Sequence, residues 1–162
     1  MTPRRRQWAA GVSLLFVMTL LVWLVRGCEA PAPPNLGARR GELAPVLASP
    51  NAVSSQAGDP QHRVEPIPCS EPIKPARERL LRVLSGMPRT KLITQTDTYL
   101  HLECRSRVFR FVDDLEFLFD EKARVIHVRS ASRVGRSDLG VNRKRVETLR
   151  ALMAAPASPD AK

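Results

Sequence analysis

The stretch FRFVDDLEFLF, residues 109–119, places apolar side chains at nearly every second position. Phe109, Phe111, Leu115, Phe117 and Phe119 share this row, which is the period of a strand with one buried face. Asp113 falls in the same row, so an uninterrupted strand would direct a carboxylate into an aromatic core. Either a bulge or turn breaks the register near Asp113, or its charge is paired inside the fold.

Further strands and two helices are predicted around this stretch. In residues 98–105, Leu100, Leu102 and Cys104 alternate with polar side chains, and residues 124–129 return as a strand after a loop at 120–123. Helical spacing is found from Pro75 to about Ser85 and from Leu139 or Asn142 to Met153. This order of elements predicts an α+β fold, a small antiparallel sheet packed with two helices, over residues 66–154.

The residues before this domain divide into two segments. Trp8 to Val25 contains only Ser13 and Thr19 as polar residues, which predicts one transmembrane helix within an anchor at 1–26. A lipoprotein signal ending at Cys28 and a cleaved signal peptide remain alternatives. Residues 27–65 are rich in Pro, Ala and Ser and predict a linker and extended arm, and residues 155–162 predict a disordered tail.

The charge distribution bears on location and partners. Arg4, Arg5 and Arg6 precede the apolar stretch, so we expect the N-terminus inside and the domain outside the cytoplasm, as a single-pass protein of a bacterial inner membrane. The net charge of +10 suits nucleic acid or an anionic membrane surface. Acids are interleaved with the bases, so we expect no nucleic acid partner, and anionic lipid remains open.

The most distinctive polar residues lie in 111–117 and 129–143. Arg143, Lys144 and Arg145 fall in or near the first turn of the last helix, where cations are unfavourable and a nearby negative charge is expected. That charge is either an external anion, such as a lipid phosphate, or a carboxylate of the same chain, which we favour. The candidate polar cluster, structural or anion-binding, comprises Asp113, Asp114, Glu116, Arg129, Ser130, Ser132, Arg133, Arg136, Ser137, Asp138, Asn142 and Arg143.

An enzymatic role is the alternative to a binding or interaction domain. Asp113, Asp114 and Glu116 could serve a hydrolase as acid and base or hold a cation, although adjacent strand residues point to opposite faces. The serines lack a G-x-S-x-G context. His101 and Glu103 resemble the H-x-E of zinc deaminases without its P-C-x-x-C, and we expect them on a polar solvent face. No metal or cofactor is predicted.

The three cysteines give no further site. Cys28, Cys69 and Cys104 show no metal-ligand spacing. Cys69 and Cys104 could pair in an oxidising compartment, and the sequence leaves that question open.

Three motifs resemble a known family, the domain of unknown function numbered 1499. They are Ser49-Pro50-Asn51 with Val53-Ser54-Ser55-Gln56, then residues 111–117, and then the long signature at 129–143. The similarity covers roughly residues 36–153. Val46 and Ala52 stand where members usually have cysteines, and Arg136 where an aromatic residue is common. The resemblance implies a bacterial or plastid context, often with a membrane or export segment, and no agreed activity or catalytic residue.

Overall fold

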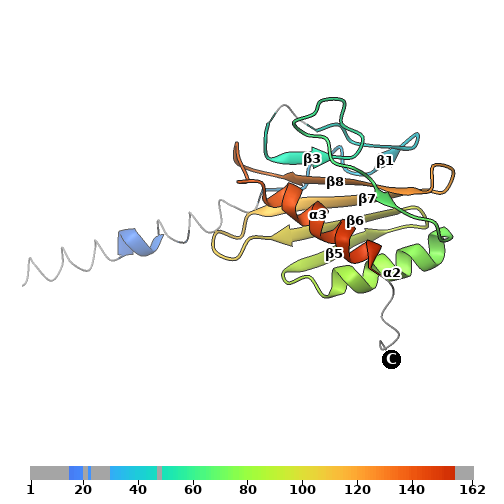
Figure 1. Ribbon diagram of the computed structural model, residues 1–162. Helices are drawn as coiled ribbons and strands as arrows, with labels where there is room; N and C mark the ends of the chain where they lie inside the picture. Colours follow the sequence, from blue (N-terminus) through green and yellow to red (C-terminus); the bar gives the residue numbers. More distant parts are fainter. Residues whose placement is uncertain (1–14, 20–21, 23–29, 47–48, 156–162) are drawn as a thin grey trace, which may run out of the picture.

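The computed structural model describes residues 15–19, 22, 30–46 and 49–155. Within these residues the chain forms a six-stranded antiparallel sheet and a separate two-stranded sheet (Figure 1). The strands of the large sheet run in the order β3-β8-β7-β6-β5, and β4 also pairs with β8. They are β3 (Ala52–Ser54), β4 (Ile67–Pro68), β5 (Thr90–Gln95), β6 (Tyr99–Arg105), β7 (Val112–Asp120) and β8 (Val125–Ser132).

Strand β7 is the centre of the sheet because it pairs along most of its length on both sides. Leu115 lies opposite Leu102 of β6 and Ser130 of β8. Leu115 and Phe117 are fully buried, together with Leu100, Ile126 and Val128 of the neighbouring strands. Alternation along the three strands directs these side chains to one common face.

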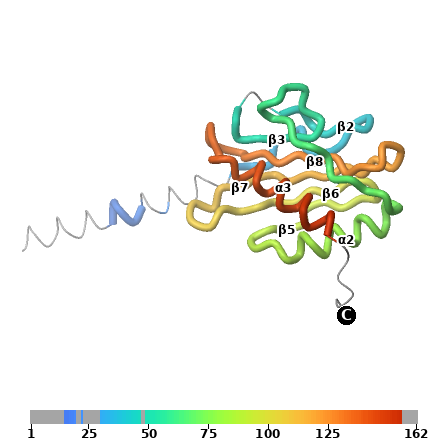
Figure 2. Tube along the Cα trace, in the orientation of Figure 1, coloured from blue at the N-terminus to red at the C-terminus, as the bar shows by residue number. Residues whose placement is uncertain are grey.

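Two helices cover that face. α2 (Ile73–Ser85) buries Ala76, Leu80 and Leu84 against it, and α3 (Val141–Ala154) buries Val146, Leu149 and Met153. Both helices lie on the same side of the sheet in the ribbon and in the tube along the chain (Figures 1 and 2). The helices and β6, β7 and β8 therefore enclose one hydrophobic core.

The opposite face of the sheet is covered by the chain that precedes β3. We name residues 30–46 the arm, which contains the two-stranded sheet of β1 (Ala38–Arg39) and β2 (Glu42–Leu43). Leu43 packs against Tyr99 and Leu118, and the exposed fraction of each side chain is below a tenth. The central strands β6, β7 and β8 are thus covered on both faces, with apolar residues on one and mainly polar residues on the other.

The predicted fold class is wrong in its balance. In place of an α+β domain with a small sheet, the described chain is a mostly β domain with six strands in one sheet and two in another. The prediction missed β1 to β4 because they are only two or three residues long, too short for a two-residue period to be visible. β5 was missed as well, because Leu92 and Ile93 are adjacent and do not alternate.

The predicted transmembrane helix is also not supported. Among the residues that the structure describes, no helix is long and apolar enough to cross a bilayer. The helical residues 15–19 belong to the apolar stretch Trp8–Val25, and much of the remainder of that stretch lies outside the described residues, as do Cys28 and the tail from 156 onwards.

The predicted aromatic row does not form one strand. β7 begins at Val112, so Phe109 and Phe111 precede it in a loop and are 61% and 38% exposed. Arg110 has a φ of 56°, in the left-handed region, which breaks the extended backbone at this point. Only Leu115, Phe117 and Phe119 of the row belong to the core.

Candidate functional site

The residues of the candidate cluster are divided by the sheet into two groups. Asp113 lies opposite Ser132 and points to the helix side, whereas Asp114 and Glu116 point to the arm side. Alternation along β7 and β8 causes this division, because neighbours in a strand face opposite ways. The structure therefore contains two polar networks, one under α3 and one under the arm.

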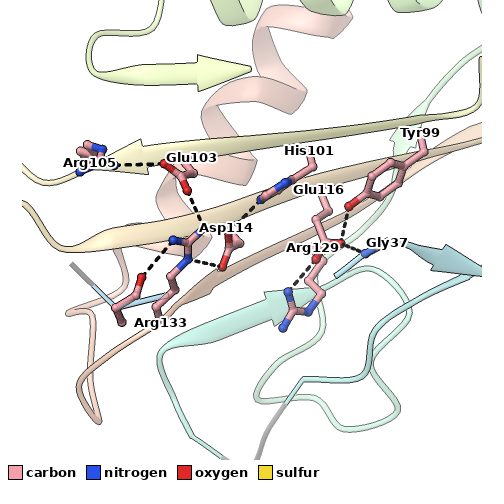
Figure 3. A network of polar contacts seen from close by, with 10 residues as sticks. Gly37, Tyr99, His101, Glu103, Arg105, Asp114, Glu116, Arg129 and Arg133 are labelled. Carbon is pink, nitrogen blue, oxygen red and sulfur yellow. Dashed lines mark hydrogen bonds and ion pairs between the residues drawn. The ribbon is translucent and has the colours of Figure 1, made fainter. Parts of the chain in front are cut away.

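On the arm side, Arg133 connects two carboxylates (Figure 3). Its Nε and Nη2 donate to Asp114 at 2.9 and 2.7 Å, and Nη2 also donates to Glu103 at 2.7 Å. Its Nη1 donates to the backbone oxygen of Ala30 at 3.1 Å, which ties the start of the arm to the sheet. Asp114 Oδ1 also lies 2.8 Å from Nε2 of His101, and Glu103 accepts from Arg105.

A second group on the same face is centred on Glu116, which is fully buried. Its carboxylate accepts from Arg129 Nη1 at 2.7 Å, from the Tyr99 hydroxyl at 2.7 Å and from the Gly37 amide at 2.9 Å (Figure 3). Three donors thus compensate the desolvation of one buried charge. Arg129 Nε is a buried nitrogen without a hydrogen-bond partner in the described structure.

The ionisation of this face follows from these contacts. Burial disfavours the charged forms of Asp114 and Glu103, but hydrogen bonds and charges outweigh burial and lower the pKa of each carboxyl group. The bonds come from His101 and Arg133 to Asp114, and from Arg133 and Arg105 to Glu103. The bond to Asp114 raises the pKa of Arg133. Burial, with the Glu116 carboxylate beside it, raises the pKa of Tyr99 far above its ordinary value.

On the helix side, Asp113 and Asn142 are the two centres. Asp113 accepts from Ser132 Oγ at 2.6 Å and from Arg145 Nη2 at 2.6 Å. The side chain of Asn142, fully buried at the start of α3, accepts from Ser130 Oγ and Arg145 Nη1, each at 2.5 Å. Its amide nitrogen donates to Ser132 Oγ and to the backbone oxygen of Asn51. This network fastens α3 to β8 and to the segment before β3.

The loop from 133 to 140 connects β8 to α3. Asp138 accepts from the amides of Gly140 and Asn142 at 3.0 and 2.7 Å, so its carboxylate lies at the positive end of the α3 dipole. Ser137 Oγ accepts from the Leu139 amide. Arg143 points away from the loop and donates to the backbone oxygens of Arg63 and Gln61.

Three arginines of the candidate cluster, Arg133, Arg136 and Arg143, do not converge on one site. Arg133 lies under the arm, Arg143 contacts the 61–63 segment, and Arg136 is exposed in the loop. The negative charges near the basic first turn of α3 are Asp138 and Asp113. The helix-side pairing of Asp113 with Arg145 also explains how an acid is accommodated in the apolar row of β7.

The geometry is unfavourable for nucleophilic or metal chemistry. Ser130 is fully buried and donates to an amide oxygen, and Asp113 beside Ser132 is held in an ion pair with Arg145. No group of three or more His, Cys, Asp or Glu suited to a metal ion occurs in the described part of the chain. His101 and Glu103, expected on a solvent face, lie beneath the arm, where His101 is 4% exposed.

The cysteines lie at opposite ends of the sheet. Cys69 follows β4 and its amide donates to Arg124, whereas Cys104 lies near the end of β6, opposite Asp113. Both are free thiols, and burial raises the pKa of each. The possible Cys69–Cys104 disulfide is therefore absent from the structure.

Several residues of the two networks were missed by sequence reasoning. Tyr99, His101 and Glu103 alternate as polar residues, which suggested solvent, because nothing in the sequence identified the arm as their cover. Arg145 was noted only as a cation near a helix start, but it lies one turn after Val141, at a position that faces β7. Asn51 accepts from Asn142 through its backbone oxygen and donates its side-chain amide to the Gly135 oxygen, and both contacts depend on distant parts of the chain.

Comparison with known proteins supports one assignment. No curated protein matches the sequence closely enough to count as a relative. The family model described as "Protein of unknown function (DUF1499)" matches residues 42–153, which is most of the chain and includes β2 to β8, α2 and nearly all of α3. The chain therefore belongs to the DUF1499 family, whose function is not known.

Proposed function

We propose that this chain is a non-enzymatic binding domain, in which the polar cluster stabilises the fold and a partner is bound at the surface. One observation supports this proposal above the others. Each carboxylate of the central motif, Asp113, Asp114 and Glu116, is paired with an arginine of the same chain. A cluster whose charges neutralise one another has little remaining capacity to polarise a substrate.

The bonds of the cluster support a role in holding segments together. Arg133 and Glu116 bind backbone groups of the arm, at Ala30 and Gly37. Asn142 and Asp113 hold α3 against β8. Each network thus connects a peripheral segment to the central strands, which is the function of buried polar groups that stabilise one packing arrangement.

The alternative is a hydrolase or metal-dependent enzyme that uses the acids, arginines and serines. A hydrolase of this kind needs a nucleophile within reach of a free base, beside an open cleft. The pockets lined by Cys69, Glu71 and Arg124 share no residue with the cluster. The proposed binding domain and the enzyme therefore make opposite predictions for the chemical reactivity of the cluster.

Two measurements on the purified full-length chain distinguish these functions. A fluorophosphonate probe followed by peptide mass spectrometry should leave Ser130, Ser132 and Ser137 unmodified, with a known serine hydrolase as positive control. Thermal unfolding in millimolar Mg²⁺, Ca²⁺, Mn²⁺ or Zn²⁺ should give the same shift for the wild type as for Asp114→Asn. Covalent labelling of a cluster serine would overturn the proposal. So would a metal-induced stabilisation that Asp114→Asn abolishes.

A further inference from the structure

The most exposed apolar side chains of the domain gather at one end of the sheet. β6 ends there, β7 begins there and β8 ends there, since the three strands are antiparallel neighbours. We name residues 106–111, which join β6 to β7, the tip. Within it Val108 is 72% exposed, Phe109 61% and Phe111 38%. The rings of Phe109 and Phe111 lie 5.7 Å apart and form one aromatic surface.

The tip is a closed loop with a defined conformation. The Ser106 amide donates to the Phe111 oxygen at 2.9 Å, and the Phe111 amide donates to Ser106 Oγ at 2.9 Å. Arg110 takes a left-handed backbone conformation with φ of 56°. In this conformation Val108 and Phe109 remain mostly exposed, so these two side chains contribute little apolar burial to the described fold.

The apolar surface is combined with positive charge. Residues 106–111 read SRVFRF, with two arginines and no acid, whereas Arg105 before them pairs with Glu103. Arg107 is exposed, and Arg89, which precedes β5 at the same end, is exposed as well. Aromatic and aliphatic groups flanked by arginine are the composition that enters the headgroup region of an anionic bilayer.

A second loop at this end repeats the pattern. Leu139 is 93% exposed, Val141 is 49% exposed, and Arg136 is exposed between β8 and Leu139. Leu139 has a φ of 54°, which is unusual for a bulky side chain, and the bonds to Ser137 and Asp138 fix the turn around it. A strained turn that presents a leucine to solvent indicates a surface built for contact.

The start of the arm lies at the same end of the sheet. Arg133, directly after β8, binds the backbone oxygen of Ala30, and the Arg133 amide donates to Val112 at the start of β7. Ala30, the first residue of the arm, therefore lies beside the start of β7, and Arg26 and an apolar stretch precede it in the sequence. The two loops lie at one end of the sheet in Figure 1.

We infer that the tip and the 136–141 loop form a docking surface for an anionic lipid bilayer. Phe109, Val108 and Leu139 enter the interfacial region, and Arg107, Arg89 and Arg136 contact lipid phosphates. This inference rests on the proposed function, because it names the partner of the binding domain. A bilayer is favoured over nucleic acid because exposed aliphatic side chains accompany the aromatic pair, whereas nucleic acid recognition needs only the cations and rings.

The experiment is hydrogen–deuterium exchange of the full-length chain with vesicles. Vesicles of phosphatidylcholine with about a third phosphatidylglycerol are compared with phosphatidylcholine alone and with a single-stranded oligonucleotide. The anionic vesicles should slow exchange in peptides covering 106–111 and 136–141 and leave residues 120–124, at the opposite end of the sheet, unchanged. Exchange is measured for each peptide separately, so protection of the tip is distinguished from vesicle contact elsewhere in the chain.

Variants of the tip then separate the contribution of positive charge to vesicle binding from the contribution of apolar contact. Arg107→Gln should weaken binding to anionic vesicles roughly fivefold, from the loss of one cation at the surface. Phe109→Ala should weaken it about tenfold. The matched control combines Lys122→Gln, in the loop at the opposite end of the sheet, with Leu152→Ala, an exposed leucine of α3, and should bind as the wild type does. Unchanged melting temperatures would show that the tip variants remain folded.

Three results would overturn the inference: no protection of the tip by anionic vesicles, equal protection by neutral vesicles, or equal protection by the oligonucleotide. Each leaves the proposed binding domain in place, because that proposal fails on reactive serines or metal stabilisation instead. Protection of both loops that is lost in the tip variants and kept in the control would establish the surface.

Discussion

Asp113 and Asp114 are adjacent in the sequence, yet their carboxylates lie on opposite faces of the sheet and bind different arginines. Asp113 pairs with Arg145 of α3 at 2.6 Å, and Asp114 pairs with Arg133 at 2.7 Å beneath the arm. The central acidic motif therefore serves two separate networks. The consequences of this division can be measured.

The pair on the arm side predicts a specific dependence of stability on pH. The folded-state pKa of Asp114 is lowered, so its contribution to the free energy of unfolding is complete above the unfolded-state pKa, about 4, and is lost as pH falls through the folded value. Asp114→Asn lacks this term. The difference in stability between wild type and variant should be largest at neutral pH and should narrow below about pH 4.

Urea unfolding at a series of pH values measures that difference. At neutral pH the loss should be about 3–5 kcal/mol for Asp114→Asn, because the Arg133 guanidinium, 5% exposed, is left without its main charged partner. Glu121→Gln, an exposed acid at the opposite end of the sheet, is the control. An equal gap at pH 7 and at about pH 3 would contradict this account.

The pair on the helix side predicts energetic coupling between β7 and α3. A double-mutant cycle of Asp113→Asn and Arg145→Gln should give an interaction energy of about 1–3 kcal/mol, since both side chains are largely buried and share bonds with Ser132 and Asn142. The exposed pair Glu147 and Arg150 on the same helix is the matched cycle and should give less than about 0.5 kcal/mol. Similar coupling in the two cycles would refute the prediction.

The arm predicts a local change in protease sensitivity. Gln56 accepts from the Leu43 amide and donates to the Gly41 oxygen, so it holds the turn between β1 and β2 against the body of the domain. Gln56→Ala should increase tryptic cleavage after Arg39 and Arg40, which are exposed, while changing global stability by only about 1–2 kcal/mol. Gln95→Ala, on the exposed edge strand β5, should leave the cleavage rate unchanged.

The thiols predict an ordered reactivity toward maleimide. Burial raises the pKa of both Cys69 and Cys104, so both should react slowly at neutral pH and faster as pH rises. Cys69 is partly exposed, whereas Cys104 is 5% exposed and also accepts a weak bond from Thr90. Peptide mapping should find Cys69 modified first and Cys104 only after addition of denaturant. Labelling of Cys104 before Cys69 without denaturant would contradict the prediction, because it would show that Cys104 is accessible in the folded domain.

Sequence reasoning reached some parts of this structure and not others. The alternation in residues 98–105 and 124–129 corresponds to β6 and β8, and the spacing of leucines before Gly86 corresponds to α2. These signals are readable because long elements repeat their burial pattern several times. Strands of two or three residues are too short to repeat a burial pattern. The pairing of β3 and β4 with β8 also depends on residues far away in the sequence.

The cluster shows the same limit. The acids and arginines were identified as residues that neutralise one another, since unpaired charges in a folded segment are costly. Which acid meets which arginine was not determined, because that depends on the register between β7 and β8 and on the path of the arm. Tyr99 and His101 were assigned to solvent because a polar face is normally an exposed face, and here the arm covers it.

The ion pairs on the two faces of β7 also restrict how the sheet can assemble. A shift of one residue between β7 and β8 would move Asp114 and Glu116 among the phenylalanines and leave Arg133 and Arg145 without their carboxylates. Each misaligned pairing would bury several unpaired charges in an apolar layer. The acidic motif thus discriminates against misregistered hairpins during folding, and this protects a sheet whose outer strand β5 offers an open edge for aggregation.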